Sequence, residues 1–564
     1  MSEVLNWGAA LAVSIGGTSR TADLTGAGAI DRELDAAGIA TLRLAHGTAK
    51  PAVGAAVLIS GIVATPYVGV VSRVGYDPGA RVWVVQCSDQ LQEQFEALGS
   101  GVAVCALLPD GAIWHRDLHG EFNDGWEAAQ DAMATIPHSI FMEGGTLHAV
   151  PWAGTGYTTT IEHAAGGIYD GSVELTEAST RERVRQLTAT VQIRYPRLHH
   201  WALAVGWAYP DWDFCDWMAH PWGLPTRQMI AETAAGNAWA LQEAGGWSAP
   251  SDELGINTTG LPASGVYCGQ IWSVLGSASD GGFAWLNKLY DTPANMVYAA
   301  SWRMGRRWAQ TIEETYTLTV SATAGTVGAV LANEQASHAA TADETGWDGS
   351  AATRLPTGAE WTISQGHRWS DRLVTANRTL VLQGMVQTLA TRIRASQRRT
   401  TLSVAVEPGS EPGLGSRCRI VAEDLSAEGQ VIQLATSWDS DSHQARCQVT
   451  LSVSGGATAG DALSAPTAPD VSPAAGGYTL ASALTLGTHI GRATDCPEQD
   501  EEWDGWISNV FEGVDIDANL EGEVYDEGFV LVTPDVPDAA RNDQVGTVTA
   551  TYTIDPLSGT LSLT

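Results

Sequence analysis

Histidines and carboxylates gather in one stretch of the chain, where they could bind a metal or act as acid and base. The set consists of His115, His119, His138, His148, Glu121 and Asp124. A further pair, His199-His200, precedes Trp201. Imidazole and carboxylate are the usual groups for both tasks. None of these histidines has i, i+4 or His-x-His spacing on a clearly predicted element, which favours a structural or surface role.

An acidic segment near the C-terminus resembles a cation site. Residues 515–519 read Asp-Ile-Asp-Ala-Asn, the opening of a calcium loop, and the acidic run Glu498–Asp504 could add oxygen ligands. However, Leu520 stands where the sharp turn of such a loop requires glycine, and Asp526 replaces the bidentate glutamate. A solvated acidic surface is the preferred interpretation.

The middle of the chain is rich in tryptophan, which could stack on sugars. Trp207 to Trp222 is the densest part, and Asp211, Asp213 and Asp216 lie within it. Paired carboxylates beside aromatic rings are typical of glycan-cleaving sites. Aromatic clusters in large proteins more often fill a core or an obligate interface, so packing is preferred and glycan binding is kept as the alternative.

The usual enzyme motifs are missing. The chain has no GxSxG, no HExxH and no P-loop, and the Gly26-Ala-Gly28 pair is followed by Asp31 where a dinucleotide fingerprint requires glycine. We therefore expect a protein that is not an enzyme, with no catalytic, cofactor-binding or metal-ligating residue.

Length and charge bound what the molecule can be. A chain of 564 residues predicts about three to five domains. Its 44% apolar residues and 61 glycines are typical of a folded, turn-rich protein. The formal net charge of −34 argues against a surface that grips nucleic acid, because duplex binding depends on lysine and arginine. The same charge is equally typical of an ordinary acidic protein.

Cysteine usage and hydropathy address the compartment. The seven cysteines are scattered without a CxxC pair, which predicts reduced and mostly buried thiols. No apolar run approaches the roughly 20 residues of a membrane helix, and the start MSEVLNWGAA lacks the basic region of a signal peptide. We expect synthesis in a cytoplasm and no membrane insertion by this chain.

The first hundred residues predict a small β-barrel-like domain, residues 1–100. The expected strands, separated by turn residues such as Asp77-Pro78-Gly79, are followed by a helical segment at Asp89–Leu98. The strands are Ala40–Leu44, Ala56–Ile59, Val68–Val74 and Val82–Cys87.

The next regions mix helix and strand. Residues 101–185 are interpreted as a mixed insertion domain with a short helix at Trp126–Thr135, and residues 186–400 as a Trp-rich α+β middle domain. Within the latter, Gln186–Tyr195 alternates as a strand and is expected to stop at Pro196. Helices are expected at Thr226–Glu243 and Leu382–Arg398, the second with Arg392, Arg394, Arg398 and Arg399 outward or near its C-terminal end.

The last third returns to strands. Residues 401–455 are interpreted as a second β-module, residues 456–477 as a Gly/Ala/Pro-rich linker and residues 478–564 as an acidic β-rich segment. Residues 456–564 hold 19 acidic and 2 basic side chains, half of the net charge. The predicted fold class is mainly β with α+β insertions, multidomain.

Two regions about 360 residues apart echo each other. In the first, Gly54 precedes AAVLIS, Gly69 opens the next strand, and Asp77 marks a turn before VWVVQC. In the second, Gly415 precedes RCRIVA, Gly429 opens the next strand, and Asp439 marks a turn before ARCQVTL. The glycines are 15 and 14 residues apart. This pattern predicts one β-module used twice, although any two β-meanders can share such spacing.

These segments carry a family resemblance. The progression VGVVSRVGYD to VVQCSDQLQ, and the late segment EGQVIQLATSWDSDSHQARCQVTLSVS ending in Leu451–Ser454, resemble the hub proteins of phage tail tips and baseplates in contractile, Mu-like and long non-contractile tailed phages. The resemblance covers roughly residues 1–100 and 400–455. It implies two barrel-like hub modules per chain.

The resemblance also implies a function and partners. It implies a homotrimeric ring that adapts a sixfold tail tube to a threefold tip and encloses the channel for the tape-measure protein and DNA. Expected partners are a distal tail protein or tail tube, the tape-measure protein and a central fibre or spike, with DNA passing without specific binding. The location would be the tail tip of the virion, after synthesis in the bacterial host cytoplasm.

Two other classes of protein remain open. The first is a glycan-binding or glycan-degrading tail protein that uses the Trp-rich middle. The second is a cellular adhesin-like binding module, which the missing secretion signal disfavours.

Overall fold

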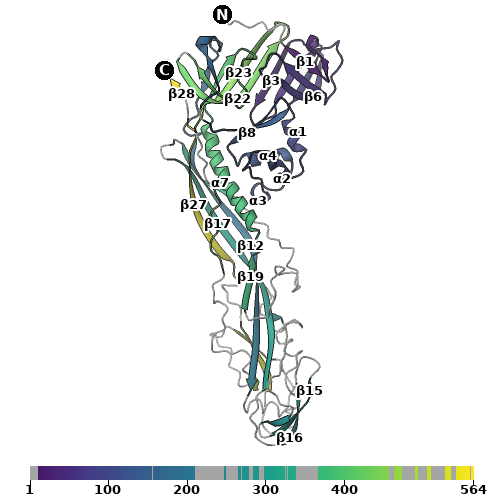
Figure 1. Cartoon of the computed structure of the whole chain (residues 1–564), viewed down its shortest axis with the longest axis vertical. Coiled ribbons are helices and arrows are strands. Elements are labelled where there is room, and N and C mark those ends of the chain that lie inside the picture. Colours follow the sequence, from purple (N-terminus) through teal and green to yellow (C-terminus); the bar gives the residue numbers. More distant parts are fainter. Residues whose placement is uncertain are drawn as a thin grey trace.

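The molecule is mainly β and consists of a broad head on a long, narrow stalk (Figure 1). The head holds both chain regions that echo each other in sequence. The stalk holds two very long strands and the longest helix. In this computed structural model, the described residues are 11–154, 156–209, 247–248, 264–267, 270–277, 284–290, 298–323, 326, 328–337, 366–371, 373–422, 424–456, 463–472, 490–492, 505–509, 527–534, 542–558 and 561–563.

The head is built mostly from short strands. Its N-terminal strands are β1 (Ala12–Ile15), β2 (Thr18–Ser19), β3 (Ala27–Glu33), β4 (Ile39–Ala45), β5 (Ala56–Ser60), β6 (Tyr67–Asp77) and β7 (Val82–Ser88). Four helices and four strands follow, namely α1 (Leu91–Glu96), α2 (Gly101–Cys105), α3 (Arg116–His119), α4 (Gly125–Met133), β8 (His138–Glu143), β9 (Thr146–Pro151), β10 (Thr159–Glu162) and β11 (Glu174–Thr176). The later head strands are β20 (Thr401–Val406), β21 (Arg417–Val421), β22 (Leu425–Asp439), β23 (Gln444–Ser452) and β28 (Leu561–Leu563).

The stalk is a sheet covered by one helix. Its elements are β12 (Val184–Tyr209), β13 (Trp247–Ser248), β17 (Tyr298–Ala322), β18 (Ala329–Ser337), β19 (Gly366–Asp371), α7 (Thr375–Gln397) and β27 (Gln544–Ile554). Two further sheets contain β14 (Ser264–Tyr267), β15 (Gln270–Ser277), β16 (Ala284–Tyr290), β24 (Ile490–Arg492), β25 (Gly505–Asn509) and β26 (Glu527–Pro534). At about 3.3 Å per residue, the 26 residues of β12 span roughly 85 Å.

One sheet of the head runs through both echoing regions. Its strand order is β11-β20-β23-β22-β3-β4-β7-β6-β5-β1-β2, with β10, β21 and β28 attached off this path. The expected mainly β fold class is therefore confirmed. The described strands form open paths without a closed barrel, so the barrel-like character of the modules stays a prediction.

Each part of the head has its own apolar core. Residues of β1 and β3 to β7 form one cluster, and residues of β20 to β23 form a second. The short helices α1, α2 and α4 enclose a third, around Phe95 and Ala129. Trp438, on β22 of the second echoing region, packs in the first cluster and so joins the two echoing regions of the head.

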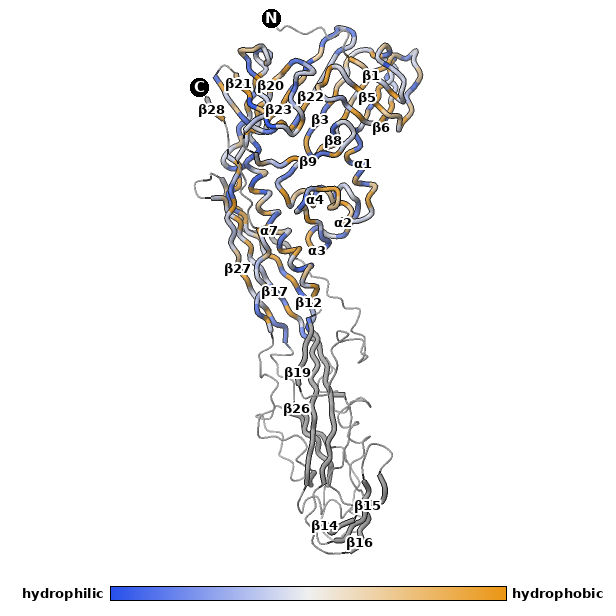
Figure 2. Tube along the Cα trace, viewed as in Figure 1, coloured by the Kyte–Doolittle hydropathy of each residue, from blue (hydrophilic) through white to orange (hydrophobic). Residues whose placement is uncertain are grey.

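Helix α7 packs along β12 and β17, and together with them it forms the core of the stalk. Its inward residues include Val386, Leu389 and Ile393. Arg394 lies in the last turn of α7, near the helix end as expected, but its side chain is buried and its guanidinium donates to the carbonyl of Asp555. The tube in Figure 2 alternates between apolar and polar colouring along the described parts of these strands.

The expectation that the strand ends at Pro196 is wrong. Strand β12 continues through Pro196, which lies opposite Thr311 of β17. On its other edge, β18 stops pairing at Gln192 and β19 starts at Arg197. On this edge Pro196 therefore lies in the gap between β18 and β19, where no described strand requires a hydrogen bond from its nitrogen.

Several strand pairings cross the predicted domain boundaries, and the division itself stays a prediction. Strands β10 and β11, before the stalk, pair with β21 and β20. After the predicted linker, β27 pairs with β17 in the stalk and β28 returns to β22 in the head. The expected helix Thr226–Glu243 lies outside the described residues. No helix in the described part is long and apolar enough to cross a bilayer.

Candidate functional site: the duplicated β-modules

The two echoing regions fold into the same arrangement of four strands. In the first module, β4 to β7, the strand order is β4-β7-β6-β5, and in the second module, β20 to β23, it is β20-β23-β22-β21. All the pairs are antiparallel in both. The predicted duplication is therefore confirmed at the level of strand order.

The register also repeats at the two glycines that revealed the echo. Gly69 of β6 lies opposite Val57 of β5, and Gly429 of β22 lies opposite Cys418 of β21. A Cβ at Gly69 would lie 2.3 Å from the carbonyl oxygen of Ser88, and one at Gly429 would lie 2.0 Å from that of Ser452. Because backbone lies so close, both positions require glycine.

A β-bulge follows each glycine at the same distance. The register of β6 with β7 shifts between Val71 and Arg73, and that of β22 with β23 shifts between Val431 and Gln433. Two bonds fix each bulge. In the first module, the N–H of Gly54 donates to the carbonyl of Val71 (2.8 Å) and the N–H of Val71 donates to the carbonyl of Ala55. In the second, the N–H of Gly415 donates to the carbonyl of Val431 (2.9 Å) and the N–H of Val431 donates to the carbonyl of Ser416. Bulges re-aim a strand, so both modules bend at equivalent points.

The hairpin tips are equivalent as well. The carboxylate of Asp77 accepts from the amides of Gly79 and Ala80, and that of Asp439 accepts from those of Asp441 and Ser442. Each turn ends four residues after the aspartate on a residue with positive φ, Arg81 at 56° and His443 at 53°. Between bulge and turn, each strand of the β22–β23 hairpin is two residues longer than its counterpart in the β6–β7 hairpin.

Strand β3 joins the two modules into one sheet. It pairs with β4 of the first module through Ala29 to Asp31, and with β22 of the second module from Gln433 to Asp439. At the outer end, Gly28 lies under the ring of Trp438, where a Cβ would lie 2.3 Å from the ring. We call this β4–β3–β22 junction the seam.

A buried ion pair holds the other end of the seam. Arg32 of β3 lies 3.7 Å from the carboxylate of Glu411, and both side chains are buried. The same carboxylate accepts from the amides of Ala64 and Gly409 at 2.7 Å. Glu411 lies between β20 and β21 of the second module, whereas Ala64 lies between β5 and β6 of the first module and Arg32 lies on β3. The contacts of Glu411 therefore link the two modules.

Strand β11 occupies in the second module the place that β3 has in the first. Both pair antiparallel with the first strand of their module, β3 through Ala29 to Asp31 and β11 through Glu174 to Thr176. A short connection leads from β3 to β4. In the second module the equivalent connection, from Thr176 to Thr401, contains α7 and every stalk strand except β27. Most of the stalk is thus an insertion into the second module, and β27 joins it from beyond β23.

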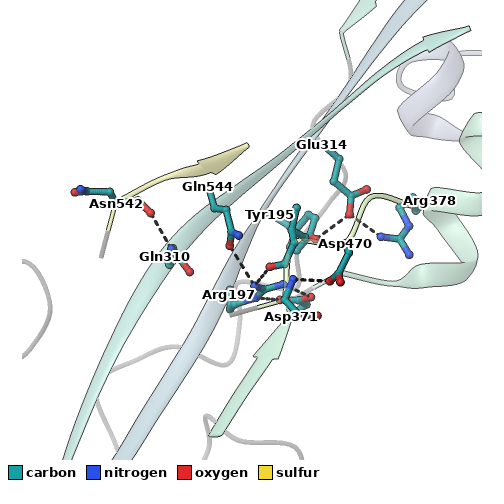
Figure 3. Close-up of polar contacts among 11 residues, drawn as sticks. Tyr195, Arg197, Gln310, Glu314, Asp371, Arg378, Asp470, Asn542 and Gln544 are labelled. Atoms are coloured by element: carbon teal, nitrogen blue, oxygen red, sulfur yellow. Dashed lines mark hydrogen bonds and ion pairs between the residues drawn. The ribbon is translucent and has the colours of Figure 1, made fainter. Parts of the chain in front are cut away.

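A buried polar network ties the strands of the stalk together (Figure 3). The carboxylate of Glu314 on β17, wholly buried, accepts from the hydroxyls of Tyr195 (2.9 Å) and Tyr316 (2.6 Å) and from the guanidinium of Arg378 on α7 (2.7 Å). Burial and the neighbouring Glu314 raise the pKa of both tyrosines, so each hydroxyl remains a donor.

Arg197 forms the second half of this network. Its side chain is 1% exposed and binds Asp371 of β19 in a bidentate ion pair, at 2.5 Å and 3.0 Å. It also donates to the carbonyl of Val471 and to the side chain of Gln544 on β27. One arginine therefore joins segments that precede and follow the second module in the sequence.

The candidate histidines do not converge on a site. His115 caps α3, its Nδ1 accepting from the amide of Asp117 at 3.1 Å, and the amide of His115 donates to His119. His148 stacks on Phe141, and burial lowers the pKa of His138. Asp124 caps α4, and Glu121 is exposed beside Arg116. Within the described residues, no group of three or more His, Cys, Asp or Glu could hold a metal.

Other candidate residues lie outside the described part of the chain. These are the aspartates of the Trp-rich middle, the acidic run Glu498–Asp504 and the loop at residues 515–519. His199, His200, Trp201 and Trp207 lie on β12. Among the described cysteines, Cys87, Cys418 and Cys447 are buried, free thiols, and burial raises the pKa of each to about 12, as expected for inert core residues.

Comparison with known proteins gives one kind of similarity. No protein-family model matches the sequence, and no curated protein matches it. Among solved structures, the chain is similar to a tail protein from Neisseria meningitidis (9% identity, TM-score 0.35, covering 78% of this chain and 95% of that one). It is also similar to the 43 kDa tail protein of prophage MuSo2 from Shewanella oneidensis (9%, 0.35, 78% and 98%). A prophage tail protein from Listeria monocytogenes follows (7%, 0.29, 78% and 94%).

Proposed function

We propose that the chain is a structural, non-enzymatic component of a phage tail, and specifically the hub of the tail tip or baseplate. The observation that carries the proposal is the duplicated module, whose strand order, glycines, bulges and turns repeat. We rest the proposal on this duplication and on the sequence resemblance, and not on the weak likeness to the solved tail proteins.

A duplicated module meets a geometric need of such a hub. A sixfold tail tube must join a threefold tip, and a trimer of chains with two similar modules each presents six similar units on one side. Closed rings require repeated complementary surfaces. The single-copy stalk would then give the threefold side its features.

The proposed hub encloses the channel through which the tape-measure protein and then DNA leave. A chain with net charge −34 offers few cations to phosphate, which would let DNA pass without binding. Proposed neighbours are a distal tail protein or the tail tube, and a central fibre or spike. The proposed location is the tail tip of the virion, reached after synthesis in the host cytoplasm.

The mass and shape of the purified full-length chain test this function. Light scattering after size exclusion should give three times the 59.4 kDa chain mass, and negative-stain images should show a ring with an axial hole. A monomer that degrades a cell-surface polysaccharide, with activity lost in Asp211→Asn or Asp213→Asn, would overturn it. The aspartates of that alternative lie outside the described residues.

A further inference from the structure

We infer that neighbouring copies of this chain join by adding β11 of one copy to the open edge of β6 in the next, in the register that β3 and β22 use within one chain. The inference follows from the module duplication and deepens the proposed hub function, because it names the surface through which the subunits would associate.

The seam within the chain supplies the precedent. Strand β22 has β23 on one edge, and on the other edge it pairs first with β21 and then, past its bulge, with β3. Strand β6 has the same neighbours up to its bulge, β7 on one edge and β5 on the other. Past its bulge, β22 pairs with β3 on this second edge. The equivalent edge of β6, at Arg73–Asp77, pairs with no described strand.

The missing partner has a counterpart in the same chain. Strand β11 corresponds to β3, since each lies beside the first strand of its module. The outer edge of β3 pairs with β22, whereas the outer edge of β11 pairs with no described strand. Within the described residues, each chain therefore presents an open acceptor edge on β6 and an open donor edge on β11. An open edge is a template for strand addition by another chain.

Exposed apolar side chains lie at both edges. Tyr76 of β6 is 41% exposed, and Val173, next to β11, is 37% exposed. Their counterparts within the seam, Thr436 of β22 and Gly28 of β3, are buried. Addition of β11 to β6 would bring Leu175 beside Tyr76 and would bury apolar surface that is solvated in the single chain.

The seam fixes the register. Asp31 lies opposite Ala435 and Ala29 opposite Ser437. Counted from the two bulges, Ala435 corresponds to Gly75 and Ser437 to Asp77. Transfer of the seam pairing to these positions places Thr176 opposite Gly75 and Glu174 opposite Asp77. The second pair is acidic on both sides, but the Asp77 carboxylate already accepts two turn amides. Ordinary salt screens what repulsion remains.

Equivalent seams also lead to closure. If the junction between chains repeats the junction within a chain, each module is related to the next by nearly the same rotation. Such a heterologous contact generates a ring when the rotations close. No copy in a closed ring keeps an open edge on β6 or β11, which removes the aggregation hazard of exposed strands.

A cysteine pair tests the register directly. Residues opposite each other on antiparallel strands have Cα atoms about 4.5–5.5 Å apart, within disulfide range. The full-length double variant Thr176→Cys with Gly75→Cys should form disulfide-linked oligomers on mild oxidation. Both sites tolerate the change, because Thr176 is exposed and a Cβ at Gly75 would meet nothing closer than 3.9 Å.

Two matched pairs serve as controls. Asp31→Cys with Ala435→Cys, the equivalent pair inside the chain, should cross-link without a change in mass. Thr176→Cys with Leu58→Cys places the second thiol at an exposed site of the same module, on β5. This pair should give no more oligomer than the unmodified chain, whose native cysteines set the background.

The outcomes separate this inference from the proposed function. Covalent trimers from the Thr176/Gly75 pair support both, and covalent rings of another size support the β11–β6 junction while contradicting the trimeric hub. A trimer by light scattering whose Thr176/Gly75 pair cross-links no better than the Thr176/Leu58 pair overturns the junction and leaves the hub standing. A chain that stays monomeric at all concentrations overturns both.

Discussion

At the scale of single residues, the two module glycines have the strictest requirement. Gly429→Ala should lower the free energy of unfolding by about 1–3 kcal/mol, because the new methyl would press on the carbonyl of Ser452 and force the backbone apart. Chemical denaturation of the full-length chain measures this. Gly75→Ala is the matched control on the equivalent strand of the first module, and it should change stability by less than about 0.5 kcal/mol. Equal losses in both variants would contradict this prediction.

Asp89 offers a test of pH dependence at one residue. Its carboxylate accepts from the amides of Gly38 (2.8 Å) and Leu91 (3.1 Å), and burial is the main cause that raises its pKa to about 6. The unfolded chain has a pKa of about 4 at this position. The folded state therefore holds its proton longer, and this group's contribution to stability falls as pH rises from about 4 to about 6.

Asp89→Asn should remove that contribution. The advantage of the unmodified chain over the variant, measured by denaturation, should be larger near pH 4 than near pH 7. If the difference between the two proteins is the same at both pH values, or grows with pH, the raised pKa is wrong.

The repeated glycines and aspartates of the two modules were easier to find from the sequence than the buried charges. Gly69, Gly429, Asp77 and Asp439 are visible in sequence because a turn or a close backbone contact requires those residue types. Arg394 was placed outward or near the helix end, since an arginine on a helix is usually solvated. Its burial depends on the carbonyl of Asp555, about 160 residues later, and local patterns carry no signal for such a partner.

At the scale of elements, the stalk depends on a few buried charges between strands and helix. Glu314→Ala should destabilise the stalk by about 2–5 kcal/mol, since two buried tyrosine hydroxyls would lose their acceptor and the partly buried Arg378 would lose its partner. Thermal unfolding followed by near-UV circular dichroism, compared with the unmodified chain, measures the loss.

The neighbouring residue provides the control for this variant. Glu313→Ala removes an ion pair with Arg194 at 3.2 Å, whose arginine is half exposed, and should cost less than about 1 kcal/mol. A loss in Glu313→Ala as large as that in Glu314→Ala would show that the buried network is not the cause.

Strand prediction was accurate where neighbours were local and failed where they were distant. The strands from Ala40 to Cys87 were expected within a few residues, because hairpins pair segments that are close in sequence. The three residues of β11 are too few to alternate recognisably, and their partner β20 lies about 220 residues away. Pro196 misled for a related reason: the gap between β18 and β19 that tolerates it is set by segments far along the chain.

At the scale of the whole molecule, the C-terminal residues stabilise the stalk and contribute little to the head. Strand β27 pairs with β17 over 11 positions and adds Ile554 to the stalk core, whereas β28 adds three residues to β22. Removal of residues 542–564 should therefore loosen the stalk and leave the head folded. Limited proteolysis should cut the truncated chain first within the stalk.

A shorter truncation separates the two contributions. Removal of residues 561–564 alone takes away β28 and should leave the protease pattern of the stalk unchanged. If the longer truncation instead exposes sites within the two modules at the same rate as in the stalk, the head and stalk unfold as one unit and this prediction is wrong.

The insertion of most of the stalk between β11 and β20 has a consequence for biosynthesis. The first module is contiguous in sequence, so it can fold as soon as it leaves the ribosome. Strand β20, the neighbour of β11 in the second module, is not made until about 220 residues after β11, which takes roughly 10 to 45 seconds at 5–20 residues per second. During that delay β11 has no β20 to hold it, so the donor edge does not yet exist. Nascent chains on one messenger would thus be kept from joining each other before the inserted part of each stalk, from β12 to α7, and β20 are made.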